Sequence, residues 1–237
     1  MNNGMLAELQ AAKTIEYLLA VGFLVLFVPF WRFAEPRGPA LEAQPARRAA
    51  RVPTGWFHVP DGVALHPGHA WARSATDGEV VVGVDDFARA VIGPIGDVDL
   101  PAAGTPIRQG EPAITLRGAA GSLPVVSPVD GLVVARNPAA RLHAVESDPY
   151  GDGWLLRVHA PRLAANGRQL LTGSTARAFM EDVAERLRGV VAPTLGPALA
   201  DGGLPVSGFA AELPPEAWER IKSEFFFADG GGVSWKA

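Results

Sequence analysis

A series of short apolar segments, each ended by glycine or proline, constrains the fold of this chain more than any other feature. The segments are rich in valine, isoleucine and leucine, and the turn residues between them recur at short, regular intervals. Six of them fit strands: 79–84 (EVVVGV), 97–101 (DVDLP), 112–117 (PAITLR), 123–129 (LPVVSPV), 131–137 (GLVVARN) and 153–160 (GWLLRVHA). This spacing predicts a small, mainly β sandwich or barrel.

Three helices are predicted beside the strands. Residues 85–93 form a short one, with Asp85 or Asp86 as N-cap and Gly93 just past its end. Residues 172–192 form a second, with Thr172 or Ser174 as N-cap, and residues 214–226 form a third that starts on two prolines. One face of each C-terminal helix is apolar: Phe179, Val183, Leu187 and Val190 on the first, and Trp218, Ile221 and Phe225 on the second. A loop is expected between these two helices, and the tail after them is expected to be flexible.

The uncharged segment from Tyr17 to Trp31, YLLAVGFLVLFVPFW, is predicted to span a membrane, so the lipid bilayer is an expected partner. Its length is near the lower limit of about 17 residues for a spanning helix. A cleaved signal peptide is the main alternative, but Glu8 and Glu16 spoil a basic leader and no small-residue cleavage site follows. A buried helix of a soluble protein is the third possibility, and the unbroken apolar run is long for one.

The charges that flank this segment predict its orientation. Lys13 is the only basic side chain before it, whereas five arginines follow it: Arg32, Arg37, Arg47, Arg48 and Arg51. The positive-inside rule therefore places the larger, C-terminal part in the cytoplasm of a single-pass protein of the cell membrane. The expected parts are an anchor (1–34), a Pro/Ala/Arg-rich linker (35–54), a β domain (55–160) and a helical extension (161–237). The linker is either a plain spacer or is held near anionic lipid by its arginines.

Composition excludes several classes of function. The net charge of −4 provides no basic surface for nucleic acid. The absence of cysteine excludes disulfides, thiolate catalysis, zinc fingers and cysteine-held iron–sulfur clusters. Three of the five histidines, His58, His66 and His69, lie near one another in sequence, but they lack a recognisable ligand spacing, so no metal is expected. The serines and aspartates form no catalytic pattern, and we expect neither an enzyme nor a bound cofactor.

Four ordered blocks resemble the glycine cleavage system H-protein family. They are HAWAR (69–73), DGEVVVGVDDFARAVIGPIGDVDLPAAGTPIRQGEP (77–112), SPVDGLVVARN (127–137) and ESDPYGDGWLLRV (146–158). Together they cover about residues 56–160. The resemblance implies a lipoyl-like fold, a flattened hybrid of barrel and sandwich, with C-terminal helices added here. It also implies a role for a β-hairpin, because H proteins carry a lipoyl group on a lysine at a hairpin tip.

The hairpin expected at 112–129 departs from the family at that lysine. The family pattern ESVKAxSDLYSPVSG, aligned on Ser127-Pro128-Val129, falls on RGAAGSLPVVSPVDG and places the lysine on Ala120 and its acidic neighbour on Arg117. No lysine occurs between Lys13 and Lys222, so no shift of register supplies one. Arginine does not replace it, because a guanidinium stays protonated and forms no such amide.

The main functional hypothesis is a membrane-anchored, non-enzymatic H-protein-like module without a lipoylation site, which binds or scaffolds a protein partner, for instance in a membrane redox complex. The hypothetical partner-binding residues form the hairpin tip: Arg117, Gly118, Ala119, Ala120, Gly121 and Ser122. The tip could equally have decayed after the lysine was lost. One alternative is a lipoyl carrier in glycine cleavage. The other is a periplasmic adaptor of the membrane-fusion type, although such adaptors usually insert a long helical hairpin that this sequence lacks.

Overall fold

The computed structural model describes residues 55–75, 78–140, 144–195 and 207–226, together with Val21, Phe23, Leu26 and Phe27. Residues 1–38 and 39–237 form two compact units. In the first unit the four described residues are helical, and the rings of Phe23 and Phe27 stack with centroids 5.3 Å apart. No helix within the described part of the chain is long and apolar enough to cross a membrane. Most of the predicted span at 17–31, the linker and the tail after residue 226 lie outside the described residues, and the membrane span stays a prediction.

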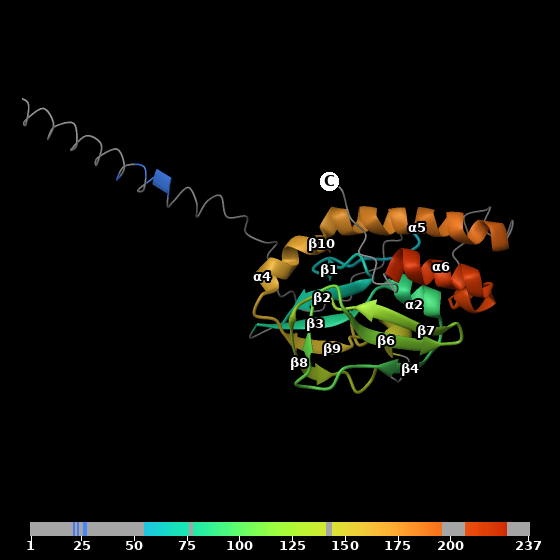
Figure 1. Cartoon of the computed structure of the whole chain (residues 1–237), viewed down its shortest axis with the longest axis horizontal. Helices are drawn as coiled ribbons and strands as arrows, with labels where there is room; N and C mark the ends of the chain where they lie inside the picture. Colours follow the sequence, from blue (N-terminus) through green and yellow to red (C-terminus); the bar gives the residue numbers. More distant parts are fainter. Residues whose placement is uncertain are drawn as a thin grey trace, which may run out of the picture. The chain divides into compact units, whose positions relative to one another are not determined.

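Two antiparallel sheets form the centre of the second unit (Figure 1). One has seven strands in the order β10-β1-β2-β3-β9-β8-β5, and the other has three in the order β4-β6-β7. Their bounds are β1 Ala64–Leu65, β2 Ala70–Ser74, β3 Glu79–Val84, β4 Ile95–Asp99, β5 Pro106–Ile107, β6 Pro112–Gly118, β7 Gly121–Val126, β8 Gly131–Arg136, β9 Leu156–His159 and β10 Leu171–Thr172. The predicted mainly β fold, with helices after the sheets, is confirmed.

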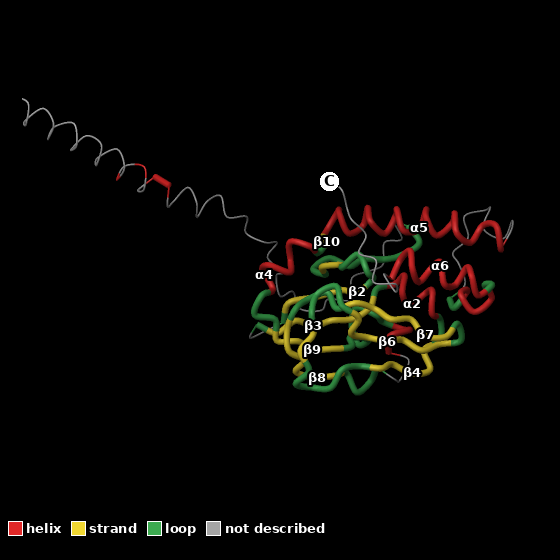
Figure 2. The backbone as a smooth tube through the Cα atoms, viewed as in Figure 1, coloured by secondary structure: helices red, strands yellow, loops and turns green. Residues whose placement is uncertain are grey.

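The described helices of this unit are α2 Asp86–Ile92, α3 Ala144–Ser147, α4 Leu163–Asn166, α5 Gly173–Leu195 and α6 Pro215–Phe226, with 3-10 turns η1 Gly167–Gln169 and η3 Phe209–Glu212. Figure 2 shows α2, α4, α5 and α6 along one side of the sheets. The predicted caps of α2 are confirmed. The carboxylate of Asp85 accepts a hydrogen bond from the Ala88 amide at 2.9 Å, and Gly93 ends the helix with a φ of 74°.

Several strand boundaries differ from those predicted. Strand β4 spans Ile95–Asp99 and not the predicted 97–101, because its pairing with β6 starts at Ile95 and ends at Asp99. Strand β9 begins only at Leu156, because the Gly153 amide donates to Asp148 and holds the preceding residues in a turn. Strand β2 was not predicted. Its first three residues are all buried, so it shows no alternation of apolar and polar residues.

Helices α5 and α6 share one hydrophobic core with the sheets. Val183, Leu187 and Val190 of α5 are buried as predicted, and Phe179 is half-buried. On α6 the predicted face is also buried, and Phe226 joins it. The rings of Phe225 and Phe226 pack against Phe87 of α2, with centroids 5.2 and 5.5 Å away. Figure 1 shows α6 between α5 and the β6–β7 hairpin, and it contacts both.

Candidate functional site

The hairpin singled out by the sequence is formed by β6 and β7. Leu116 pairs with Leu123, Arg117 with Ser122 and Gly118 with Gly121, so only Ala119 and Ala120 remain to make the turn. Gly121 has a φ of 109°, a backbone conformation that side chains rarely allow, which explains a glycine after the turn. Leu116 and Leu123 are fully buried and fix the hairpin to the core. The structure therefore brings all six predicted tip residues together at one end of the three-stranded sheet.

The tip packs closely on the end of α2. A methyl group at Gly118 would lie 2.8 Å from the carbonyl oxygen of Ile92 and 3.0 Å from that of Pro94. Such distances are too short for carbon and oxygen in van der Waals contact, so any side chain at Gly118 would push the hairpin away from α2. The small residue at this position is therefore required by the fold, whatever the tip does.

Exposure is uneven across the tip. Ala119 and Ser122 are exposed, whereas Ala120 is half-buried and packs against the hydrophobic core. The Arg117 guanidinium donates to the Ser122 hydroxyl at 3.2 Å and lies 3.9 Å from the Asp99 carboxylate. Both partners of that ion pair are largely exposed, and such pairs contribute little to stability. The Arg117 side chain is thus available for contacts with another molecule.

Helix α6 flanks the tip, and sequence reasoning missed this contact. The Trp218 indole nitrogen lies 3.8 Å from the position of a methyl group at Gly121. The Lys222 ammonium lies 5.4 Å from the centre of the Trp218 ring and pairs with Glu219 at 2.7 Å. The sequence placed Trp218 on the apolar face of a helix. No sequence signal indicated which strand that face covers, because nearly 100 residues separate the two.

A polar network holds the other end of the same hairpin, at the SPVDG motif. Asp130 accepts hydrogen bonds from the Gln109 amide at 2.9 Å and from the Asn166 side-chain amide at 3.0 Å. The Asn166 side chain in turn accepts from the Asp130 amide at 3.1 Å. The bonds from Gln109 and Asn166 favour the carboxylate and hold the pKa of Asp130 below its usual range. This network ties the start of β8 to α4.

The histidines considered as metal ligands have other partners. The His69 ring pairs through Nδ1 with the Asp85 carboxylate at 2.7 Å, and both are fully buried. His66 accepts from the Gly68 amide through Nδ1 at 3.0 Å, and burial, followed by the neighbouring His69, lowers its pKa to about 4. The His58 ring packs edge-on against the Tyr150 ring, with centroids 6.4 Å apart. Among the described residues, no group of three or more histidine, aspartate or glutamate side chains could hold a metal ion.

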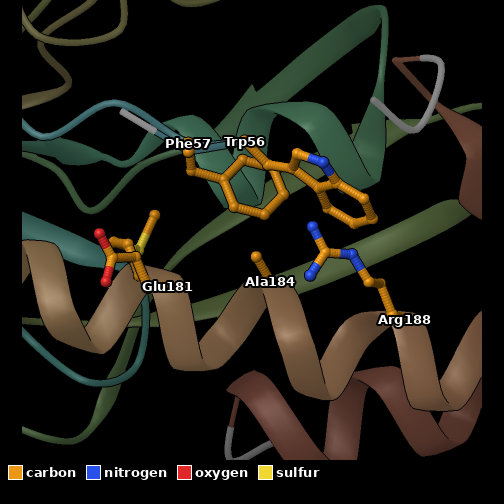
Figure 3. Close-up of a pocket in the computed structure, with 7 residues that line it drawn as sticks. Trp56, Phe57, Glu181, Ala184 and Arg188 are labelled. Atoms are coloured by element: carbon orange, nitrogen blue, oxygen red, sulfur yellow. The ribbon is translucent and has the colours of Figure 1, made fainter. Parts of the chain in front are cut away.

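Two of the hollows among the described residues lie away from the tip. One, of about 110 Å³, forms where the chain enters the domain, between Trp56 and Phe57 on one side and α5 on the other (Figure 3). Figure 3 shows the Arg188 side chain reaching toward the Trp56 indole, whose ring centre is 4.1 Å from the guanidinium carbon. The other, open and of about 300 Å³, is lined by residues of β4, β5 and β6 and the segments after β4 and β5. None of the six tip residues lines either hollow.

The comparisons with known proteins point to one family. The family model of the glycine cleavage H-protein matches residues 64–183. The glycine cleavage system H protein of Cronobacter sakazakii is 32% identical over 127 residues, which are 53% of this chain and 98% of that protein. That of Aeromonas salmonicida is 35% identical over 103 residues, 43% of this chain and 80% of the relative. A crystal structure of a glycine cleavage system H protein from Mycobacterium marinum matches 53% of this chain and 98% of its own, with 26% identity and a TM-score of 0.44. The chain belongs to the glycine cleavage H-protein family.

Proposed function

We propose that this protein is an H-protein-like module that uses its β6–β7 hairpin tip to dock on another protein, without a lipoyl group at that tip. The proposal rests on the residue that occupies the turn of this hairpin. Ala120 takes the place that the family's lysine has in the gapless alignment, and its methyl group is half-buried against the core. The chain has lysines only at positions 13, 222 and 236. The proposed role is non-enzymatic, because the tip provides a surface of small residues and one guanidinium for binding but no reacting group.

A membrane tether is part of the proposal. The uncharged segment 17–31 and the arginines after it support a single-pass anchor with the H-like domain on the cytoplasmic side. Anchoring would hold the hairpin tip near membrane-bound partners and raise its effective concentration there. Fractionation of cells followed by a carbonate wash tests this part by itself, and recovery of the chain in the washed, soluble fraction would contradict it.

Position-specific crosslinking tests the docking role. The chain contains no cysteine, so Ser122→Cys creates a single thiol at the tip. Ser174→Cys at the start of α5, which is also exposed, is the matched control. With a thiol-linked photocrosslinker on detergent-solubilised membranes, we expect one discrete adduct from Ser122→Cys, none from Ser174→Cys, and loss of the adduct when Arg117→Glu is added. Equal labelling from both positions would contradict a docking role for the tip.

A lipoyl carrier in glycine cleavage is the second candidate, and the comparisons favour it more directly than they favour a scaffold. The relatives in question are glycine cleavage H proteins, and one of them is matched over nearly its whole length. For this chain to carry a lipoyl group, Lys13, Lys222 or Lys236 would have to accept it, and none of the three lies on the hairpin. The mass of the intact protein separates the two candidates.

A further inference from the structure

Helix α6 lies outside the part of the chain that matches the family. The family match ends at residue 183, whereas α6 spans Pro215–Phe226. The Cronobacter relative is matched over 98% of its length within 127 residues, which leaves almost none of it for a counterpart of α6. Such a relative therefore has almost no residues left to form a counterpart of α6, which in this chain covers part of the family domain.

The contacts of α6 are apolar on its inner side and weak on its outer side. Its Trp218, Ile221, Phe225 and Phe226 side chains are buried, and the chain leads into it through a bond from the Gly208 amide to the Ala90 carbonyl at 2.8 Å. Outside, Arg186 of α5 lies 3.4 Å from the Glu224 carboxylate and 4.7 Å from the centre of the Phe225 ring. Partly exposed ion pairs of this kind add little, so apolar burial holds the helix in place.

The surface that α6 covers includes one buried polar atom that lacks a hydrogen-bond partner among the described residues. The Nε2 atom of His69 has no hydrogen-bond partner among the described residues, although its ring is buried. The ring packs among phenylalanines of three helices, with centroids 4.3 Å from Phe87 of α2, 5.1 Å from Phe226 of α6 and 5.7 Å from Phe179 of α5. Burying an unsatisfied nitrogen costs free energy, which would be regained if α6 moved away and water reached the ring.

From these observations we propose that α6 is a self-supplied cap, which covers the face formed by α2, β7 and His69 and opens as a unit while the sheets stay folded. The cap lies against the hairpin tip through Trp218, so its closed state blocks a second molecule from that side of the tip. This inference deepens the proposed docking function by giving it a regulating element, but its test needs no partner and no lipoyl group.

Native-state hydrogen exchange on the full chain in low concentrations of denaturant tests the cap. We expect amides of α6 to exchange through an opening that is separate from, and at least tenfold more frequent than, the one that exposes β3 and β9. Trp218→Ala should raise exchange in α6 at least tenfold and leave β3 unchanged. Arg220→Ala, on the exposed side of the same helix, is the matched control and should change neither.

A second measurement distinguishes the opening of α6 from general misfolding of the variant. The dye 8-anilinonaphthalene-1-sulfonate, which binds exposed apolar surface, should bind Trp218→Ala more than the wild type or Arg220→Ala, while the far-ultraviolet circular dichroism of the sheets is retained. If α6 and β3 exchange together in the wild type, or if Trp218→Ala loosens both equally, α6 is an integral part of the core and the cap is wrong. Either result leaves the crosslinking test of the tip unaffected.

Discussion

The two ends of the β6–β7 hairpin are held in different ways. At the base, Asp130, Gln109 and Asn166 exchange directional hydrogen bonds that fix the turn into β8. At the tip, Gly118 allows close backbone approach to the end of α2, and Trp218 of α6 packs beside the turn. The base therefore depends on matched hydrogen-bond donors and acceptors, whereas the tip depends on the small size of its residues. The two ends of the hairpin should respond to different kinds of substitution.

Acid should produce the largest change in the free energy of unfolding, and this change comes from a group outside both ends of the hairpin. Folding keeps His66 neutral to about pH 4, whereas the unfolded chain protonates near 6.5. Between these values the unfolded state binds more protons, so stability is complete above about pH 6.5 and falls as the pH drops towards 4. The loss should reach about 3 kcal/mol. Urea unfolding as a function of pH measures it.

The His66→Asn variant is the control for that measurement. The amide oxygen of asparagine can accept the Gly68 hydrogen bond in place of Nδ1, and the group does not titrate. The slope between pH 6.5 and 4 should flatten in this variant. An unchanged slope would assign the acid sensitivity to other groups.

Removing the base network should have the next largest effect. Asn166→Ala deletes the bonds to the Gln109 and Asp130 side chains and the bond from the Asp130 amide. We expect a loss of about 2–3 kcal/mol, because three hydrogen bonds are lost and half-buried groups are left unpaired beside a carboxylate. Gln169→Ala, exposed in the neighbouring turn, should change stability by less than about 0.5 kcal/mol. Equal effects from the two variants would show that the base is not held as described.

A methyl group at the tip should cost somewhat less. Gly118→Ala places a carbon against the Ile92 and Pro94 carbonyls, and overpacking of this kind costs about 1–3 kcal/mol. Ala119→Ser, at the exposed position beside it, should be close to neutral. Thermal unfolding of the pair measures the difference, and a neutral Gly118→Ala would remove the argument that packing on α2 requires a glycine.

The smallest effect is expected from a variant that removes the charge of Asp130 and keeps the shape of its side chain. Asp130→Asn keeps an oxygen for the Gln109 amide but loses the acceptor for Asn166, so we expect a cost of about 1 kcal/mol at neutral pH. The pKa of Asp130 is lowered by folding, so its contribution is present above the unfolded pKa and is lost as the pH falls through the folded one. The variant should converge with the wild type in strong acid. A constant difference at every pH would contradict the role of the charge.

The parts of the structure that the sequence predicted are those with local causes. The caps of α2 depend on Asp85 and Gly93, and the buried face of α6 depends on a regular spacing of large apolar residues. Each of these features is determined by residues that lie within about a dozen positions of one another in the sequence. The contact between Trp218 and Gly121 joins distant segments, and the burial of β2 on both sides hides its alternation. The hairpin tip and the helix at 214–226 were therefore both located from the sequence, whereas the contact between them was not.

The mass of the intact protein shows whether the hairpin tip of this H-protein family member carries a lipoyl group. The full chain is produced in cells supplied with lipoate and active in attaching it, with the variants Ala120→Lys and Ala119→Lys produced beside it. We predict the unmodified mass for the wild type and for Ala119→Lys, and a lipoyl adduct for Ala120→Lys, which shows that the cells attach the group. A lipoyl adduct on the wild-type chain would contradict this prediction and establish the carrier function instead.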